Sequence, residues 1–152
     1  MIRDQLSDAL KTSMKEKKQV AVSTLRLIQA AIKDRDIAAR SKGVDDGISD
    51  EEILQVLQTM VRQRHDSIEM YTKGNRDELA EREAQEIEVI QGFMPRQLDD
   101  AEMEAAIDQV VEATGAASIK DMGKAMGALR ERYAGQMDFG KAGAALKARL
   151  AG

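Results

Sequence analysis

Apolar residues recur at intervals of three or four along almost the whole chain, and this spacing places them on one face of an α-helix. The first stretch carries them at Ile2, Leu6, Leu10 and Met14. Strands favour aromatic and β-branched residues, whereas this chain has 9 Met and only 2 Phe, 2 Tyr and no Trp. The pattern therefore predicts an all-α fold.

The single proline, Pro95, divides this helical pattern. Proline disfavours a helical conformation at the residue before it, so we expect a helix to end at about Met94. The break predicts an N-terminal domain of about four helices over residues 1–95 and a small three-helix bundle over residues 96–152.

Capping residues mark where several of these helices begin and end. Ser49 and Glu52 have the spacing of a capping box, in which each side chain accepts a hydrogen bond from a free backbone N–H. Gly74 suits a left-handed helix end. In the C-terminal domain, the expected helix starts are Asp99, Ser118 to Asp121, and Asp138.

Composition excludes several classes of protein. The chain has no Cys, which rules out disulfides and thiolate metal ligands. Asp4 and Asp8 lie where a secretory signal would be apolar, and no apolar run reaches membrane-spanning length. We therefore expect a cytoplasmic protein with no membrane partner.

Charge is distributed unevenly along the chain. The formal net charge of −4 argues against general binding to DNA through a long-range field. From residue 113 onward, however, seven basic residues face only three acidic ones. The C-terminal end is therefore basic on an otherwise acidic protein.

No self-contained catalytic centre, cofactor site or metal site is expected. Residues 135–141 match the GxxxxGK pattern of a phosphate-binding loop, but Ala142 stands where Ser or Thr would hold magnesium. This segment is interpreted as a turn followed by a helix start. His65 is the only histidine, and we expect it to be half-buried and to pack rather than to catalyse.

Two positions break the apolar pattern of their helices. Arg64 occupies a place in the apolar stripe, where its head either reaches solvent or pairs with a carboxylate such as Glu83. Gly123 and Gly127 lie on one helix face, and each costs about 1 kcal/mol relative to Ala. They permit close approach either by another helix of the bundle, which is the favoured interpretation, or by a binding partner.

Four stretches resemble the YqeY family, the freestanding relatives of the helical tail of the GatB subunit of the tRNA-dependent amidotransferase. They are residues 24–33 (TLRLIQAAIK), 63–71 (QRHDSIEMY), 94–98 (MPRQL) and 120–127 (KDMGKAMG). The resemblance runs from about residue 20 to the C-terminus. One departure is Phe93, which stands where the family has Tyr.

The resemblance implies an all-α protein and a tRNA-binding role, since the tail of the amidotransferase helps to bind the body of a misacylated tRNA. The family label is a carbon–nitrogen ligase with glutamine as amido donor, although the tail lacks that active site. Our hypothesis is an accessory tRNA-binding module that serves an amidotransferase or an aminoacyl-tRNA synthetase. The expected RNA contacts are Lys120, Lys124, Arg130, Lys147, Gly123 and Gly127.

Two alternatives remain open. One is a protein-interaction adaptor whose Met122 and Met126 line an apolar groove, because Met adapts to irregular surfaces. The other is an amidotransferase activity of the chain itself, for which no nucleophile or nucleotide loop is evident. An exposed Met face would favour the adaptor, and a lysine-lined face beside the glycines would favour RNA.

Overall fold

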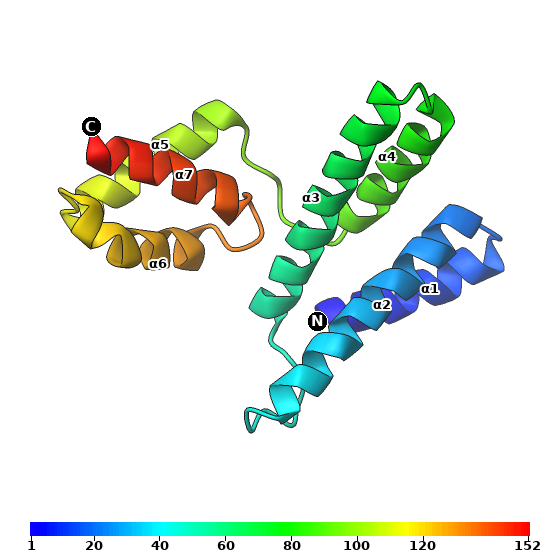
Figure 1. Ribbon diagram of the computed structural model, residues 1–152. Helices are drawn as coiled ribbons and strands as arrows, with labels where there is room; N and C mark the ends of the chain where they lie inside the picture. The colour runs from blue at the N-terminus through cyan, green and yellow to red at the C-terminus, as the bar shows by residue number, and fades with distance from the viewer. The chain divides into compact units, whose positions relative to one another are not determined.

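The computed structural model describes all of residues 1–152 and consists of seven α-helices and one short 3-10 helix, without strands. The predicted all-α fold class is confirmed. The chain forms two compact units, Met1–Met94 and Pro95–Gly152 (Figure 1). No helix combines the length and the hydropathy needed to cross a lipid bilayer.

The N-terminal unit is built from two antiparallel helical hairpins (Figure 1). The first joins α1 (Ile2–Lys15) to α2 (Gln19–Arg40), and the second joins α3 (Asp50–Lys73) to α4 (Asp77–Gln91). Helix α2 packs against both α1 and α4. The completely buried side chains of this core come from all four helices and include Leu6, Ile28, Leu57 and Ile90.

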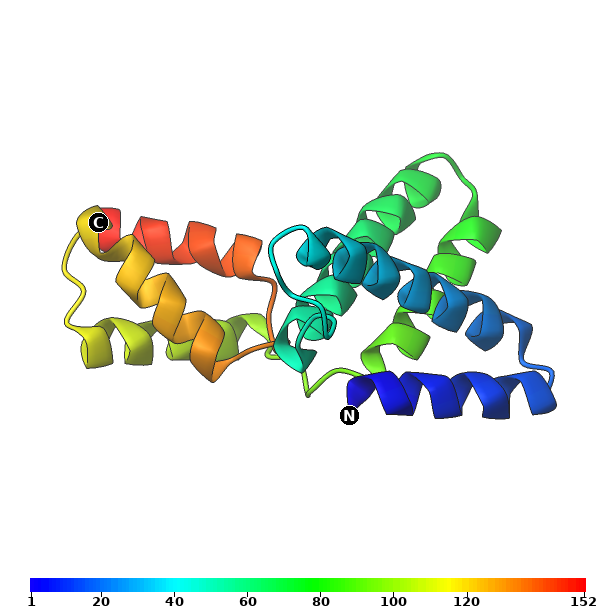
Figure 2. The same cartoon turned by 90° about the horizontal axis from the view of Figure 1, so that it is seen from below.

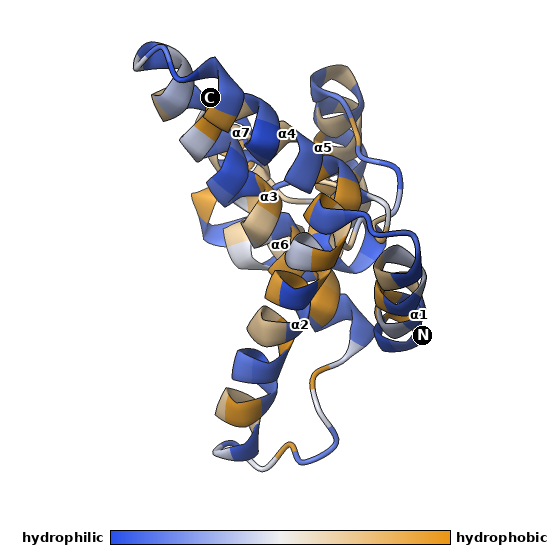
Figure 3. Ribbon diagram, turned by 90° about the vertical axis from the view of Figure 1, so that its right-hand side faces the viewer, coloured by the Kyte–Doolittle hydropathy of each residue, from blue (hydrophilic) through white to orange (hydrophobic).

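The apolar residues of each helix face its neighbours. Orange and blue segments alternate along the helices of Figure 3, as the spacing of three or four residues predicts for amphipathic helices. The helices are therefore held by burial of one face rather than by intrinsic propensity alone.

Several helix ends differ from the sequence-based expectations. Helix α4 ends at Gln91, three residues before the expected Met94. Gly74 is not left-handed, with φ −89°; Asn75 adopts that conformation instead, with φ 59°, and Asn tolerates it well. Ser49 does accept a hydrogen bond from the Glu52 backbone N–H, 3.2 Å away.

Arg64 pairs with carboxylates of the neighbouring helix, as one of the two sequence interpretations predicts. Its Nε lies 3.5 Å from Glu86 and 4.0 Å from Glu83, and its side chain is only 12% exposed. Burial, together with the nearby Glu86, raises the pKa of the Glu83 carboxyl group. The spacing of acidic residues in the sequence did not predict this interaction between the two carboxylates.

The C-terminal unit is a three-helix bundle (Figure 2). It contains α5 (Asp100–Thr114), η1 (Ile119–Asp121), α6 (Met122–Arg132) and α7 (Phe139–Ala151), and each α-helix contacts the other two. Asp99 and Glu102 form the expected capping box at the start of α5. Gly115 ends that helix in the left-handed conformation, with φ 69°. The core includes the fully buried Ala125, Leu129 and Leu146.

Candidate nucleic-acid interface

The two glycines of α6 lie on the solvent face of the C-terminal unit. Both are exposed, and a Cβ atom built on either one would meet no other atom within 4 Å. The favoured interpretation, that they allow another helix to approach closely, is wrong. The buried face of α6 carries Ala125 and Leu129, and the glycines lie on the opposite side.

A different glycine of the bundle faces a neighbouring helix. A Cβ atom at Gly143 of α7 would lie 3.7 Å from the Met126 Cε of α6. This position was not predicted from the sequence, although a glycine inside a predicted helix was the available signal. Gly143 therefore faces α6 at an ordinary contact distance, whereas nothing packs on Gly123 or Gly127.

The exposed glycines weaken α6 without a compensating contact inside the chain. Glycine in a helix costs about 1 kcal/mol relative to Ala because it loses more backbone entropy on folding. Because nothing packs on either glycine, the folded chain itself supplies no interaction that offsets this loss. The absence of side chains at Gly123 and Gly127 leaves a small, open surface on α6.

Lys120 and Lys124 flank this open surface, and both are exposed. Other cations of the same unit are held in ion pairs: Arg96 with Glu102 at 2.6 Å, Lys141 with Asp100 at 2.7 Å and Arg149 with Asp108 at 3.1 Å. Lys120 and Lys124 take part in none of these ion pairs. Their ammonium groups remain available to an external anion.

Asp121, between the two lysines, is committed to the start of the helix. Its carboxylate accepts hydrogen bonds from the backbone N–H groups of Ala117 and Ser118, at 2.8 and 3.2 Å. These bonds, with a smaller contribution from Lys124, lower the pKa of the Asp121 carboxyl group. The carboxylate caps the helix and does not form an ion pair with either lysine.

Arg130 and Lys147 extend the basic surface. Arg130 lies one turn beyond Gly127 and is exposed. Lys147 is exposed on α7, one turn after Gly143, and η1 also contacts α7. Helices α6 and α7 run antiparallel (Figure 1). All four predicted cationic contacts are therefore exposed, and their joint role as an RNA-binding surface stays a prediction; Glu131 is an exposed acid near the end of α6.

One large apolar residue is exposed in the C-terminal unit, and it was not among the predicted site residues. Ile119 is 49% exposed and lies one turn before Gly123. Met122 and Met126 are half-buried and pack against the C-terminal core. The methionine face required by the adaptor alternative is therefore largely covered.

The segment that matches a phosphate-binding loop is a turn and a helix start, as expected. Asp138 caps α7 by accepting a hydrogen bond from the Gly140 N–H at 2.8 Å. Lys141 is held by Asp100.

His65 is exposed, so the expectation that it packs against the core is wrong. Its position falls beside the buried stripe of α3 rather than on it. No group of three or more His, Cys, Asp or Glu side chains is arranged to hold a metal ion.

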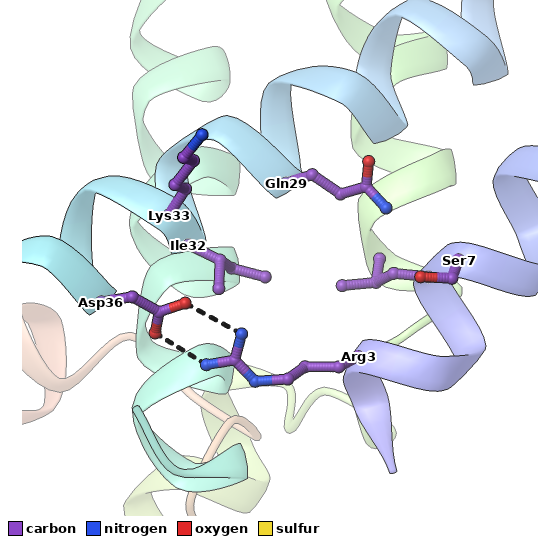
Figure 4. Close-up of a pocket in the computed structure, with 7 residues that line it drawn as sticks. Arg3, Ser7, Gln29, Ile32, Lys33 and Asp36 are labelled. Atoms are coloured by element: carbon purple, nitrogen blue, oxygen red, sulfur yellow. Dashed lines mark hydrogen bonds and ion pairs between the residues drawn. The ribbon is translucent and has the colours of Figure 1, made fainter. Parts of the chain in front are cut away.

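A hollow of about 170 Å³ between α1 and α2 has a structural role. Arg3 donates two hydrogen bonds to Asp36, at 2.9 and 2.7 Å (Figure 4). Asp36 also accepts from the Ile48 N–H at 2.8 Å, and Arg3 donates to the Ile48 carbonyl at 3.1 Å. The Arg3 hydrogen bond is the main cause that lowers the pKa of the Asp36 carboxyl group. These groups fasten the loop before α3 to the first hairpin.

Comparison of the sequence with known proteins identifies its family. The model of the YqeY family, described as Yqey-like protein, matches residues 3–150. Curated relatives carry the name "Altered inheritance of mitochondria protein 41, mitochondrial". The relative from Lachancea thermotolerans is 31% identical over 70% of this chain and 56% of its own length. The relative from Candida glabrata is 35% identical over 59% of this chain and 47% of its own length.

A third relative of the same name, from Vanderwaltozyma polyspora, is 28% identical over 77% of this chain and 64% of its own length. The chain therefore spans about half to two thirds of the length of these relatives. Their names place them in mitochondria, and the expected cytoplasmic location of this chain stays a prediction. Because the family model covers nearly every residue, the chain belongs to the YqeY family.

Proposed function

We propose that this protein is an accessory RNA-binding module whose C-terminal unit contacts the sugar–phosphate surface of tRNA through the outer face of α6. The observation that carries the proposal is the open surface at Gly123 and Gly127, where an added Cβ would meet nothing within 4 Å. A partner that approaches the helix backbone closely explains why these two positions lack side chains.

The chemistry of the flanking residues supports a polyanionic partner. Lys120 and Lys124 are exposed beside the glycines and outside the ion pairs of their unit. Ammonium groups attract phosphates as point charges without reading bases. Folded RNA is bound largely through its shape, its phosphates and its 2′-hydroxyl groups, and the elbow of tRNA offers such a surface.

The covered methionines make the adaptor alternative less suitable. Met122 and Met126 pack against the core of their own unit, so little flexible apolar surface remains for a protein groove. Ile119 is the remaining large apolar side chain exposed in this unit. One isoleucine among several cations fits an RNA surface better than a protein interface, whose centre is depleted of charge.

Catalysis would come from a partner protein in this proposal. The family resemblance links the chain to tRNA-dependent amidation, and the module would position the tRNA for an amidotransferase or an aminoacyl-tRNA synthetase. Glutamine-dependent carbon–nitrogen ligation would then take place on that partner. Ammonia release from glutamine by the purified chain alone would overturn this division of roles.

A binding titration tests the proposal directly. The full-length chain is titrated with total tRNA at several salt concentrations, with double-stranded DNA as a control. Contacts from Lys120, Lys124, Arg130 and Lys147 should contribute about 3 to 4 to the magnitude of the log–log salt slope, and Lys120→Gln/Lys124→Gln should reduce that magnitude by about 1.5. Lys33→Gln/Lys42→Gln changes the net charge equally, in the N-terminal unit, and should leave the slope nearly unchanged.

A further inference from the structure

The end of the α1–α2 hairpin is strongly basic within an acidic unit. Residues 11–26 contain five basic residues and one acidic residue, whereas the rest of the N-terminal unit contains ten basic and seventeen acidic residues. The five are Lys11, Lys15, Lys17, Lys18 and Arg26. We use the name hairpin tip for residues Met14–Arg26.

The backbone at the hairpin tip holds a lysine where glycine would be more stable. Lys17 adopts the left-handed conformation, with φ 58°, just after α1 ends at Lys15. The Lys18 N–H donates to the Ser13 carbonyl at 3.0 Å, which closes the helix end. Glycine is the usual residue at this position. A lysine there indicates that its side chain has a use outside the turn.

Helix dipoles explain only part of this charge. Cations near the end of α1 interact favourably with its carbonyl groups, which accounts for Lys15. Lys18, however, is the first flanking residue of α2, and no acidic residue occupies the first turn of that helix. A cation at a helix start is unfavourable, so the dipole of α2 does not account for Lys18.

Apolar and cationic residues of the hairpin tip line the same hollow. A hollow of about 370 Å³ is lined by Met14, Lys17, Gln19, Val22, Ser23 and Arg26. Met14 is 50% exposed. Lys18 pairs with Glu16 at 3.0 Å, whereas Lys17 and Arg26 take part in no ion pair with a neighbouring acid. The hollow of the hairpin tip is thus lined by two apolar side chains, Met14 and Val22, and by two cations outside any ion pair.

We propose that the hairpin tip is a second RNA-binding site, which holds a single nucleotide unit of a folded RNA. Lys15, Lys17, Lys18 and Arg26 bind the phosphates, and the hollow over Met14 and Val22 receives a ribose or an unstacked base. This inference rests on the proposed function, because it assigns a second contact to the same RNA.

The shape of the surface favours a nucleotide over a lipid bilayer. A nucleotide joins an anionic phosphate to a flat base with an apolar face, and both parts find a partner in the hollow. Binding to a bilayer instead requires apolar side chains that insert below the level of the cations. Of the six residues that line the hollow, only Met14 and Val22 are apolar, which leaves little apolar surface to insert into a bilayer.

Two sites on one chain would cooperate through effective concentration. Once one unit is bound, the second site searches only a small volume, so overall affinity exceeds that of either site alone. The charges of the two sites also add to the salt dependence, since each phosphate contact releases counterions. Removing the lysines of the hairpin tip should therefore weaken binding even though the α6 face is intact.

The experiment compares three full-length variants in tRNA titrations at several salt concentrations. Lys15→Gln/Lys17→Gln/Lys18→Gln removes three charges from the hairpin tip. Lys33→Gln/Arg35→Gln/Lys42→Gln removes three charges farther along the same unit and is the matched control. Lys120→Gln/Lys124→Gln tests the α6 face. Circular dichroism melting confirms that each variant is folded.

We expect the hairpin-tip variant to reduce the magnitude of the salt slope by about 2 to 3 and to bind tRNA at least tenfold more weakly at low salt, with the control near wild type. An unchanged salt slope for the hairpin-tip variant, together with a reduced slope for Lys120→Gln/Lys124→Gln, would refute the hairpin-tip site and leave the α6 site supported. Failure of the wild type to bind tRNA would refute both proposals. Tip-dependent binding to phosphatidylserine vesicles, without an effect on tRNA, would assign the tip to lipid instead.

Discussion

Replacing both exposed glycines of α6 by alanine should stabilise the protein and weaken RNA binding at the same time. Neither new Cβ meets another atom within 4 Å, so the substitution adds no clash to the folded chain. Alanine also loses less backbone entropy than glycine when a helix forms. The double variant Gly123→Ala/Gly127→Ala therefore separates folding from binding.

The expected gain follows from the place of each glycine in the helix. Gly127 lies in the middle of α6 (Met122–Arg132) and should contribute about 1 kcal/mol, whereas Gly123 lies in its first turn and should contribute about 0.5 kcal/mol. A total of about 1.5 kcal/mol should raise the Tm of the C-terminal unit by roughly 6 to 12 °C. Differential scanning calorimetry measures this shift.

Binding should respond in the opposite direction. If RNA approaches the helix backbone at the glycines, two methyl groups hold its phosphates away, and tRNA affinity should fall by about tenfold, or 1.4 kcal/mol. Ala105→Gly, on the exposed side of α5, is a control that should lower stability by about 1 kcal/mol without changing affinity. Stabilisation with unchanged affinity would refute the role of the glycines, and destabilisation would refute the open surface.

Three further substitutions test individual interactions. Lys17→Gly places glycine at a left-handed position that lysine now occupies. In urea titrations the free energy of unfolding of the N-terminal unit should rise by about 0.5 to 1 kcal/mol. A lower free energy of unfolding would show that the turn needs the lysine. Asp36→Asn should make the stability of the protein less sensitive to acid. The pKa of the Asp36 carboxyl group is lowered in the folded state, so its stabilisation is present above its ordinary pKa and is lost as pH falls through the lowered value. The Tm should therefore fall less for the variant than for the wild type between pH 6 and pH 2. Arg64→Met removes the buried cation between Glu83 and Glu86 and leaves Glu86 only the more exposed Arg82, 3.9 Å away. The variant should lower the free energy of unfolding by about 2 to 3 kcal/mol in urea titrations. A neutral result would mean that Arg82 and solvent already compensate the two carboxylates.

The helices and their punctuation could be predicted because they depend on local features. Apolar spacing, the sole proline and the side-chain caps at Asp99 and Asp138 all act within a few residues of sequence. The helix end at Asn75 rather than Gly74 shows the limit of such reasoning. Both residues tolerate the left-handed conformation, and the hydrogen bonds of the final turn decide which one adopts it.

The function of the two glycines could not be decided from spacing. A pair of small residues four positions apart has the same pattern whether it faces a helix or solvent. The burial of Ala125 and Leu129 shows which face of α6 meets the core. The basic hairpin tip was also missed, although its lysines are adjacent in sequence. Its hollow is formed by side chains from two helices, which no single stretch of sequence reveals.

Hydrogen–deuterium exchange of the full-length chain, with and without saturating tRNA, tests the central claim most directly. We expect slower exchange in the segment that contains η1 and α6, residues 119–132, because phosphates cover the exposed backbone beside Gly123 and Gly127. The acidic helix α5, residues 100–114, should be unchanged. Protection of α5 with no change in residues 119–132 would contradict the account.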